Sequence, residues 1–528
     1  MNRTIERAAE ARPDHLCLRD EERSLTYAEA WVAAGRFARG YRALGVSRQE
    51  PVLLMLDNHL DSTLAWLGLS FNASMESLVN TAYKGRYLAH LVNDSRARFA
   101  VIEEAYLDRV LAVGSDTLET VIVRPSKGSD VTVPALPQAR RGPRIVPFGE
   151  LEAHGAAGPE AVSAWDLLAI LYTSGTTGLS KGAVLAHAAA FTTAEFTGRQ
   201  TRDDIRYVVA PQFHVAGQWG GVYRALIPAS TAYIASGFHA TTFWDEVRDV
   251  GATTTQLVGT MPEFLMRQPP KPDDGDNPMR DVYMTPVTAD VQQFRARFGV
   301  DVVTGFGSTE AGTILIDNDP DQVAPRRCGW AHPDVEVRLV DEHDREVAVG
   351  EVGEAVVRPK LPWTVMVRWH GLPARSAEAW RNGWLHSGDA LRRDADGIYY
   401  FVDRVDDAIR RRGENVSSLE VELEVNSHEE VQESAAVAVP SEYSEDEIKV
   451  VVVRVEGSTL TEAELVLYLA ERMPYFMVPR FVEFVEDMPR TPTQKIRKAE
   501  LRAVGIGDAW DREAAGIEVS RRGVRTTG

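Results

Sequence analysis

The sequence predicts an α/β protein with a large N-terminal domain of layered sheets and helices, and a small C-terminal α+β domain. Three observations support this prediction. Helical and strand patterns alternate up to Gly329, which favours largely parallel sheets. Short strands separated by Gly and Asp turns follow Gly329, which indicates a β-rich subdomain. The chain has 528 residues, which is long enough for two or more domains.

Apolar spacing predicts the elements of the N-terminal part in chain order. Three segments have the period of an amphipathic helix, and four short apolar runs between and after them predict strands. The expected helices cover residues 25–44, which Gly45 closes, 81–95 and 183–196. The expected strands cover residues 51–56, 99–102, 166–172 and 207–210. Two segments rich in Pro, Gly and charge are expected on the surface, at residues 124–160 and 268–278.

The C-terminal part has helix and strand signals of its own, beginning near Asp407. The second of its helices opens with a capping box, formed by Thr461 and Glu464. The charged, Gly-rich tail after Asp511 is expected to be loosely ordered. The expected helices cover residues 418–426 and 461–473, and the expected strands cover residues 435–439, 450–455 and 481–485.

Composition excludes several classes of protein. The net charge of −19 disfavours general binding to nucleic acid or to anionic membranes, because both are polyanions. An anionic ligand would therefore need a locally positive site. Cys17 and Cys328 are the two cysteines, so we expect no disulfide framework, no thiolate metal cluster and a reducing cytoplasm. The polar N-terminus predicts no signal peptide, and no apolar stretch approaches the ~20 residues of a membrane span.

The strongest local signal is the segment from Leu171 to Gly182, which reads Leu-Tyr-Thr-Ser-Gly-Thr-Thr-Gly-Leu-Ser-Lys-Gly. An apolar strand runs into a loop of hydroxyls and glycines, and a helix is expected to follow. Glycines let backbone N–H groups turn toward an anion, hydroxyls add donors, and the lysine supplies charge. This composition suits a polyphosphate. The expected contacts are Thr173, Ser174, Gly175, Thr176, Thr177, Gly178 and Lys181.

Other motifs fit the sequence less well. The Gly-Lys-Ser/Thr ending of a P-loop is absent. Residues 178–182 match the G-x-S-x-G elbow of serine hydrolases, with Ser180 as nucleophile, but a neighbouring lysine and a Ser/Thr-rich approach do not belong to that elbow. Gly305-Phe-Gly307 is a fragment of a dinucleotide fingerprint, which fails because Glu310 stands at the third glycine position.

Six motifs in one order resemble the adenylate-forming superfamily, which includes acyl-CoA and aryl-CoA synthetases, adenylation domains of peptide synthetases, and luciferases. The resemblance covers nearly the whole chain. The motifs are Tyr172–Gly182, Pro211–His214, Gly305–Glu310, Gly383–Asp389 with Asp403 and Arg404, Arg412–Ser417 and Pro489–Lys495. One such motif would be weak evidence, whereas six in the correct order are very specific.

The resemblance implies an ATP-dependent enzyme that activates a small carboxylic acid as its acyl-adenylate and then transfers the acyl group to the thiol of CoA. It implies that Lys495 bridges the carboxylate and the α-phosphate, that Thr309 donates to the α-phosphate, and that Glu310 binds Mg²⁺. Asp389 would accept hydrogen bonds from the ribose hydroxyls, and Arg404 would contact ribose or phosphate. Further nucleotide or CoA contacts are expected from Phe306, Gly307, Ser308, Gly413 and Glu414.

The resemblance also indicates where the acid binds. His214 is interpreted as a wall or gate of the acid pocket and not as a base, and ordinary packing is the competing interpretation. Gln218 and Trp219 would shape the same pocket, unless they pack in the core. The segment Tyr283-Met-Thr-Pro-Val287 departs from the Gly-rich turn of many members, which predicts an unusual pocket. The expected pocket residues are His214, Gln218, Trp219, Met284, Thr285 and Pro286.

By the same resemblance, the chain divides into an AMP-binding domain, a hinge, a mobile lid domain and a flexible tail. The lid would present Lys495 for adenylation and then rotate about Asp406 to bring the Gly413 loop in for thiol transfer. Arg410–Arg412 would contact CoA phosphates, or else lie on a solvated helix face. The expected ranges are 1–404 for the AMP-binding domain, 405–407 for the hinge, 408–510 for the lid and 511–528 for the tail.

Within the superfamily, the sequence most resembles the bacterial carnitine/crotonobetaine-CoA ligase-like group, through Val79–Gly85 and Ile409–Asn415. Two further departures are Gln494, in place of the usual Gly before the lysine, and Phe306, which lacks a Tyr hydroxyl. Neither removes an obligatory charge, so we expect activity.

Three alternatives remain open at this point. The acyl group could pass to a carrier-protein thiol in trans, since no carrier domain is fused to the chain. The enzyme could adenylate a non-carboxylic acid, such as nitrite for aryl-amine diazotisation. The chain could also bind nucleotide without turnover, although intact Lys495, Glu310 and Asp389 argue against this. The sequence specifies neither the acid nor the oligomeric state.

Overall fold

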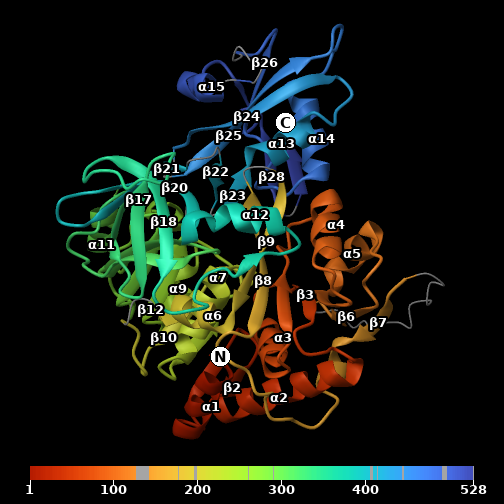
Figure 1. The fold of residues 1–528 in the computed structure, drawn as a ribbon, viewed down its shortest axis with the longest axis vertical. Helices are drawn as coiled ribbons and strands as arrows, with labels where there is room; N and C mark the ends of the chain where they lie inside the picture. The colour runs from red at the N-terminus through yellow and green to blue at the C-terminus, as the bar shows by residue number, and fades with distance from the viewer. Residues whose placement is uncertain are drawn as a thin grey trace. The chain divides into compact units, whose positions relative to one another are not determined.

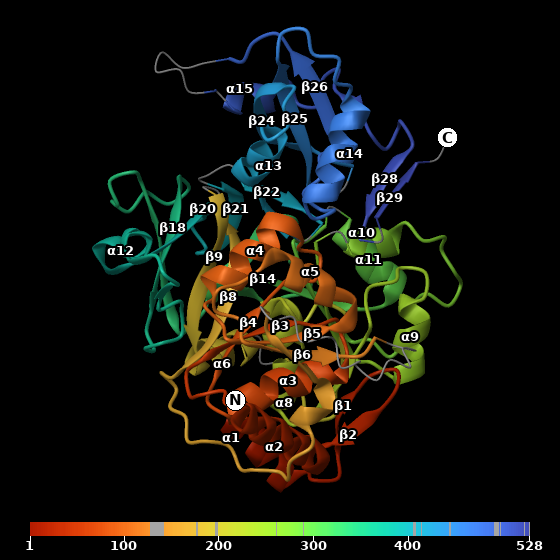
Figure 2. The ribbon, with the colours of Figure 1, turned by 90° about the vertical axis from the view of Figure 1, so that its right-hand side faces the viewer.

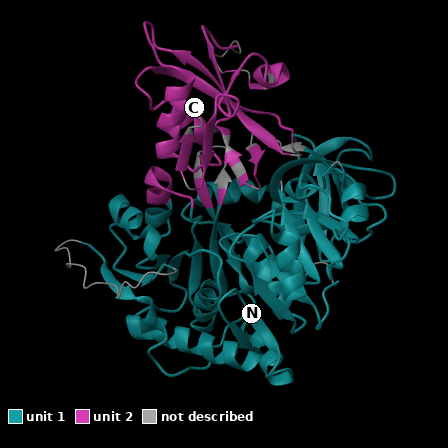
Figure 3. Cartoon of the chain, turned by 180° about the vertical axis from the view of Figure 1, so that it is seen from behind, with its two compact units in different colours: residues 1–81, 91–172, 182–403 teal, residues 82–90, 173–181, 404–528 magenta. Residues whose placement is uncertain are grey.

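The computed structural model describes every residue except 127–141, 176–177, 196–198, 260, 289, 405–407, 413, 443–444, 490–495, 497, 522 and 527–528. The chain forms two compact units, which Figure 3 shows in teal and magenta. Unit 1 comprises residues 1–81, 91–172 and 182–403. Unit 2 comprises residues 404–528 together with residues 82–90 and 173–181, two short segments that lie far away in the sequence.

One sheet of the described chain has eight strands and a parallel centre, as the alternation of short apolar strands with helices predicts. Strand β3 lies between β4 and β5, so the chain leaves β3 on one side through α3 and returns on the other side through α4. In spatial order the strands are β19 (Arg368–Trp369), β9 (Gly178–Ala186), β8 (Leu167–Gly175), β4 (Met75–Leu78), β3 (Pro51–Met55), β5 (Phe99–Glu103), β6 (Thr120–Arg124) and β7 (Arg144–Pro147).

The other large sheet has thirteen strands, and its pairing changes from parallel to antiparallel at β14. Strands β10 to β14 pair in parallel, whereas β15 and the strands that follow it are antiparallel. The β-rich part that the sequence predicted after Gly329 is thus present, but it begins earlier, at Gly312. In spatial order the strands are β17 (Val335–Val340), β18 (Val352–Pro359), β20 (Leu385–Arg393), β21 (Tyr399–Arg404), β16 (Arg327–Ala331), β15 (Gly312–Asp317), β14 (Asp301–Ser308), β13 (Asp281–Thr285), β12 (Thr254–Val258), β10 (Ile205–Val208), β11 (Thr231–Ile234), β1 (Leu16–Arg19) and β2 (Ser24–Thr26).

The helices of the first 400 or so residues cover these sheets. They are α1 (Asn2–Ala11), α2 (Tyr27–Leu44), α3 (Leu60–Phe71), α4 (Gly85–Asp94), η1 (Glu104–Tyr106), α5 (Leu107–Val113), η2 (Phe148–Leu151), α6 (His187–Glu195), α7 (Val215–Gly217), η3 (Gln218–Tyr223), α8 (Arg224–Leu226), α9 (Phe243–Val250), α10 (Met261–Met266), α11 (Val291–Phe298), α12 (Pro373–Ala379) and η4 (Arg381–Gly383). Segment η3 is a π-helix.

Helix α2 begins and ends where its sequence signals require. Thr26 and Glu29 form a capping box at its start, and Gly45 ends it in the left-handed conformation with φ 96°. Its inner face packs on α3, which lies beside it in both Figure 1 and Figure 2. Gly68 permits this approach, because a side chain there would meet the Phe37 side chain. The predicted helix at residues 25–44 is thus confirmed.

The predicted helix at residues 183–196 is wrong in its first turn. Residues 183–186 continue strand β9, and helix α6 begins only at His187. In the sheet, Ala183 pairs with Trp369 and Val184 with Arg368. A short Ala/Val/Leu run suits either conformation, so pairing with a strand far along the chain decides between them. The phosphate-loop candidate therefore joins two strands and not a strand and a helix.

The C-terminal part of unit 2 is an α+β body around a four-stranded sheet. The capping box of Thr461 and Glu464 is present at the start of α14. Helix α15 covers one face of the sheet, where Leu501 packs near Val437 and Val451. The elements are β22 (Ala408–Arg411), β23 (Glu414–Ser417), α13 (Ser418–Val425), β24 (Val431–Pro440), β25 (Asp446–Arg454), α14 (Glu462–Arg472), β26 (Phe481–Val485), α15 (Lys498–Val504), β27 (Trp510–Asp511), β28 (Ile517–Ser520) and β29 (Gly523–Thr526).

The tail after Asp511, for which the sequence suggested loose order, contains the hairpin of β28 and β29. Arg512 explains this difference, because its buried guanidinium donates to the carbonyls of Pro479 at 3.0 Å and Ile517 at 2.9 Å. Composition alone does not reveal that a tail arginine supplies buried hydrogen bonds. Among the described residues, no helix combines the length and the apolar character that a membrane crossing requires.

Candidate functional site

The 305–310 segment lies where β14 ends and the chain turns back into β15. Side chains are excluded from its glycines by the neighbouring backbone. A Cβ on Gly307 would stand 2.1 Å from the Gly312 carbonyl oxygen, and one on Gly305 would stand 2.5 Å from the Leu315 carbonyl oxygen. Glycine is therefore required at both positions for the two strands to approach this closely.

The turn that follows presents Thr309 and Glu310. Ser308 Oγ accepts a hydrogen bond from the Ala311 N–H at 3.2 Å, which closes the turn. The Glu310 carbonyl accepts from the Met366 N–H at 2.7 Å, so a second loop supports the turn. Both side chains are half-buried. The segment thus offers a hydroxyl and a carboxylate on a backbone held from two directions.

Phe306 lies just before this turn and is also half-buried. Its ring packs against that of Phe401, with the two centroids 5.8 Å apart. An aromatic ring held in this way can stack on a flat base. The sequence predicted Phe306 as a nucleotide contact, and the geometry is compatible with that role.

The predicted pocket residues at the end of β13 divide into two kinds. Thr285 and Pro286 are half-buried, with Thr285 the last residue of β13 and Pro286 directly after it. Strand β13 pairs in parallel with β14, which carries Phe306. Met284 is fully buried, and its carbonyl accepts a hydrogen bond from Thr304 Oγ1 at 2.7 Å. Ligands of open α/β sheets bind beyond the carboxyl ends of the strands. Thr285 and Pro286 occupy such a position, whereas the Met284 side chain belongs to the core.

The loop that carries His214 is anchored by Gln212, which the sequence did not single out. The Gln212 side chain is buried and accepts hydrogen bonds from Thr63 Oγ1 at 2.7 Å and Trp66 Nε1 at 3.2 Å. Its amide nitrogen donates to the His59 carbonyl and to Ser62 Oγ. All these partners lie in or next to α3, so they become visible only in the folded chain. His214 itself is half-buried at the end of this anchored loop.

Gln218 and Trp219, which the sequence offered as pocket or core residues, are both buried in unit 1. Gln218 begins the π-helix η3, and its Nε2 donates to Glu76 Oε2 at 2.5 Å. Glu76 lies on β4 and was not predicted as a functional residue. Burial raises the pKa of its carboxyl group to about 8, and the hydrogen bonds of Gln218 and Trp219 oppose that rise.

Asp389, the predicted ribose contact, lies on β20 and is 2% exposed. Its N–H donates to Ser387 Oγ at 3.1 Å. The preceding Gly388 N–H donates to Glu354 Oε1 at 3.0 Å, and His386 Nδ1 lies 2.9 Å from the other oxygen of the same carboxylate. The segment is thereby tied to β18.

The phosphate-loop candidate is described in its flanks. Residues 173–175 end β8 and residues 178–181 begin β9, whereas Thr176 and Thr177 lie outside the described residues. Thr173 and Lys181 are half-buried. Ser180 is 4% exposed on β9, and its carbonyl lies 2.8 Å from His90 Nε2. A hydrolase elbow requires an exposed serine between a strand and a helix, so the structure excludes that interpretation.

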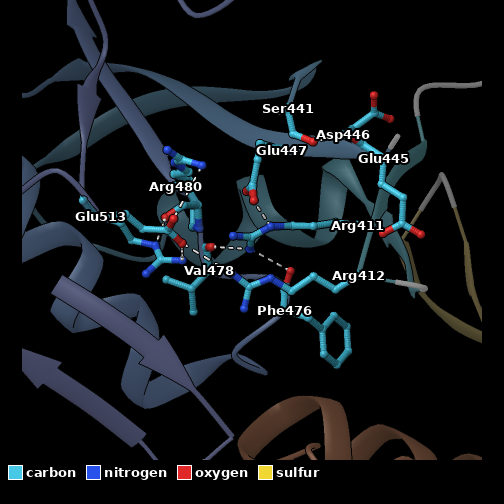
Figure 4. A network of polar contacts seen from close by, with 12 residues as sticks. Arg411, Arg412, Ser441, Glu445, Asp446, Glu447, Phe476, Val478, Arg480 and Glu513 are labelled. Atoms are coloured by element: carbon cyan, nitrogen blue, oxygen red, sulfur yellow. Dashed lines mark hydrogen bonds and ion pairs between the residues drawn. The ribbon is translucent and has the colours of Figure 1, made fainter. Parts of the chain in front are cut away.

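The basic run Arg410–Arg412 does not lie on a helix, so that expectation is wrong. Arg410 and Arg411 end strand β22, and Arg412 begins the turn to β23. Arg411 is fully buried, and Figure 4 shows its contacts with Glu447 and with the backbone at Phe476 and Val478. Its Nη1 donates to the carbonyls of Phe476 at 2.9 Å and Val478 at 2.7 Å, and its Nε lies 2.6 Å from Glu447 Oε2. Burial lowers the pKa of Arg411 to about 10, although Glu447 opposes this.

Carboxylates also accompany the other two arginines of the run. Arg410 Nε lies 3.7 Å from Glu445, and Arg412 Nη2 lies 3.4 Å from Glu513. Sequence reasoning could not find these pairs, because each acid lies at least 35 positions away, as in Arg410 and Glu445. The buried Arg411 thus supports the C-terminal unit and is not open to a ligand.

Besides Thr176 and Thr177, the predicted residues Lys495, Asp406 and Gly413 also lie outside the described residues. Arg404 ends β21, and Glu414 is half-buried at the start of β23. In the described part of the chain, no group of three or more His, Cys, Asp or Glu side chains is arranged to hold a metal ion. A single carboxylate such as that of Glu310 is sufficient for Mg²⁺, because this ion is commonly held by one or two carboxylates together with water and substrate phosphates.

We predict that Arg411→Met destabilises the C-terminal unit by about 3–5 kcal/mol, because it leaves Glu447 as an uncompensated buried charge. Arg412→Met is the matched control, since both partners of its ion pair with Glu513 are about one third exposed, and that pair is expected to contribute less than about 1 kcal/mol. Thermal denaturation of both variants is the measurement. Equal melting temperatures for the two variants would contradict the role assigned to Arg411.

Comparison with known proteins places this architecture in a family. The AMP-binding enzyme model matches residues 5–365, and the AMP-binding enzyme C-terminal domain model matches residues 420–495. The crotonobetaine/carnitine–CoA ligase of Citrobacter koseri is 30% identical over 495 residues, which are 91% of this chain and 93% of that protein. The ligase of the same name from Salmonella enteritidis is 30% identical over 493 residues, with the same coverage of both chains.

Solved structures agree in fold. ATP-bound MatB from Rhodopseudomonas palustris has a TM-score of 0.68 at 26% identity, covering 96% of this chain and 99% of that one. A benzoate CoA ligase from Burkholderia xenovorans has a TM-score of 0.67 at 26% identity, covering 95% of this chain and 100% of that one. Since the first family model matches well over half of the residues, the chain belongs to the AMP-binding enzymes.

Proposed function

We propose that this AMP-binding enzyme uses ATP to activate a small carboxylic acid as an acyl-adenylate and then transfers the acyl group to the thiol of CoA. The observation that carries the proposal is the closed turn at residues 305–310, within a chain whose relatives over 91% of its length are CoA ligases. That turn offers a hydroxyl and a carboxylate beside an aromatic ring, and this combination suits a nucleoside triphosphate.

The two steps place different demands on the protein. In the first, a carboxylate oxygen of the acid attacks the α-phosphorus of ATP, and the bond to pyrophosphate breaks. In the second, the sulfur of CoA attacks the acyl carbon, and AMP leaves with the bridging oxygen. Positioning and charge neutralisation supply most of the catalysis in such phosphoryl chemistry. We assign Thr309 to the α-phosphate and Lys495 to the space between α-phosphate and carboxylate.

The nucleotide would be held by the remaining predicted residues. Phe306 would stack on adenine, while Asp389 and Arg404 would bind the ribose. The backbone and hydroxyls of residues 173–178 with Lys181 would bind the β- and γ-phosphates. Bound Mg²⁺ would neutralise charge on the phosphates, and Glu310 would be its protein ligand.

A mobile C-terminal domain would reconcile the two steps. Lys495 and the incoming thiol need the same position, so we propose that residues 408–510 turn about Asp406 between the steps. Gly413 and Glu414 would then face the pantetheine arm. These roles rest on the family resemblance.

The names of the relatives favour CoA over a carrier-protein thiol, and a carboxylic acid over nitrite. The curated relatives are named for crotonobetaine and carnitine, so acids of that size are the first candidates to test.

The proposal predicts acid-dependent exchange of pyrophosphate into ATP, and thioester formation only when CoA is added. A panel of small acids, each measured with and without CoA, tests both steps. In this assay Lys495→Ala should lower exchange by at least ~100-fold, because it removes the cation that bridges the two reactants. The melting temperature should stay unchanged. Wild-type exchange in this variant would remove Lys495 from the mechanism, and no exchange with any acid would contradict the proposal.

We further predict that Gly307→Ala lowers exchange by about 10- to 100-fold, because the new Cβ forces β14 and β15 apart and displaces Thr309 and Glu310. Gly149→Ala is the matched control, since a Cβ there meets nothing within 4 Å. Comparison of exchange rates and melting temperatures of the two variants is the measurement. A Gly307→Ala enzyme as active as the control would refute the close approach as the constraint on the turn.

A further inference from the structure

Glu76 is a buried carboxyl group in the centre of unit 1. It lies on β4, where it pairs in register with Val52 on β3 and Ala169 on β8. Its side chain is 1% exposed and lies on the same strand face as Leu78, which belongs to the main core cluster. Alternate residues of a strand face opposite sides, and the neighbouring Met75 joins a different cluster. Water therefore does not solvate this carboxyl group.

Its polar surroundings supply one hydrogen bond of ordinary geometry, from Gln218, a weaker polar contact with the Trp219 side chain, and no positive charge. Gln218 Nε2 donates to Glu76 Oε2 at 2.5 Å. No described residue forms an ion pair with Glu76. Glu76 also affects the titration of Tyr41 on α2: burial is the main cause that raises the pKa of this phenol, and the charge of Glu76 raises it further. The Tyr41 hydroxyl donates to the Ala65 carbonyl at 3.2 Å.

Two oxygens of this pair lack a partner. Among the described atoms, neither Glu76 Oε1 nor Gln218 Oε1 has a hydrogen bond. Both are acceptors, and burying either without a donor is unfavourable, more so for a charged group. A proton on the carboxyl group removes the charge and supplies an O–H donor, so one added proton resolves both deficits. Turning the Gln218 amide over exchanges the two roles and still requires that proton.

We propose that Glu76 is held as a neutral carboxylic acid that donates its O–H to Gln218, and that this acid–amide pair is a positioning element for the acid-binding wall at His214. This inference rests on the proposed function, because the role of His214 belongs to it. The backbone links the two directly: the His214 carbonyl accepts from the Gln218 N–H at 3.0 Å.

The π-helix that Gln218 begins has little freedom to adjust. A Cβ on Gly221 would stand 2.7 Å from Val208 Cγ1, and one on Gly220 would stand 2.8 Å from Gln256 Oε1. Segment η3 is therefore seated closely on β10 and β12. If Gln218 moves, η3 has no space to absorb the movement, and the His214 loop, to which Gln218 is hydrogen-bonded, moves with it. π-Helices are frequently found at functional sites, which agrees with this assignment.

Ionisation of Glu76 would break the pair, which gives the inference a pH signature. Burial raises the pKa of Glu76 from its ordinary 4.5 to about 8. The native state thus holds a proton that the unfolded chain releases near pH 4.5. Its stabilising effect is fully present below that pH and is lost progressively as the pH rises through about 8. Over the same upper range the Michaelis constant for the acid should rise.

The test compares Glu76→Gln, Glu76→Leu and the swap Glu76→Gln/Gln218→Glu in the full-length enzyme. A glutamine at position 76 can donate to Gln218 and accept from it, so its Michaelis constant for the acid at pH 7 should stay within about twofold of wild type, and its pH dependence above pH 7 should disappear. Glu76→Leu should raise that constant at least ~10-fold and leave the Michaelis constant for ATP unchanged. The swap keeps one carboxyl group and one amide, so its Michaelis constant for the acid should equal that of wild type.

Isotope-edited infrared difference spectroscopy of wild type against Glu76→Gln supplies a readout that needs no activity. A protonated-carboxyl band at pH 7 that disappears in the variant is the expected result. Absence of that band, or a Glu76→Gln enzyme as impaired as Glu76→Leu, would overturn the inference. If Glu76→Leu does not fold, the swap and the spectrum still decide. A wild type without acid-dependent exchange would refute the proposed function, while the band would still test Glu76.

Discussion

The close approach of backbone to backbone at β14, β15 and β16 is the constraint on which the candidate site depends. Gly307 meets Gly312 across the first pair of strands, and Gly329 meets Ile316 across the second, where a Cβ would stand 2.1 Å from the Ile316 carbonyl oxygen. A buried ion pair between Arg327 and Asp317, at 2.5 Å, ties the same strands. Because glycines occupy the points of contact, the strands can approach closely and hold the short turn that carries Thr309 and Glu310.

This constraint acts together with the direction of the sheets. The parallel strands β10, β12, β13 and β14 all end on one edge, and the chain leaves that edge through the His214 loop, Thr285 and the 305–310 turn. An edge of this kind brings together residues that are far apart in sequence. The buried Gln212 side chain fixes the His214 loop, and the buried Glu76–Gln218 pair fixes the start of η3. The chemistry lies in loops, while buried amides and carboxyls determine where the loops stand.

Local signals in the sequence predicted much of this architecture. The capping box at Thr461 and the glycine at position 45 each act within one turn of helix, so the sequence alone identified them. The family motifs identified the 305–310 turn because its glycines are required by backbone contact. The predictions failed where a distant partner decides the outcome. Residues 183–186 pair with β19, and Arg411 pairs with Glu447, 36 positions along the chain.

No local signal in the sequence predicts which segments of the chain make up unit 2. Residues 82–90 join it through long-range contacts: Lys84 Nζ donates to the Ala470 carbonyl at 2.5 Å, Tyr87 donates to the Glu420 carbonyl at 3.1 Å, and Arg86 pairs with Glu424. Glu76 was missed for a related reason. A single Glu in an apolar strand looks like a surface residue of an exposed edge, and only the position of Gln218 shows that it is buried with a partner.

The central claim is that the acid is activated through a bond between its own oxygen and the α-phosphorus of ATP. Mass spectrometry of AMP formed from an acid labelled with oxygen-18 in its carboxyl group tests this bond directly. The account predicts that each AMP formed in the complete reaction with CoA carries one labelled oxygen. Unlabelled AMP, or label recovered in phosphate with ADP as the nucleotide product, would contradict it.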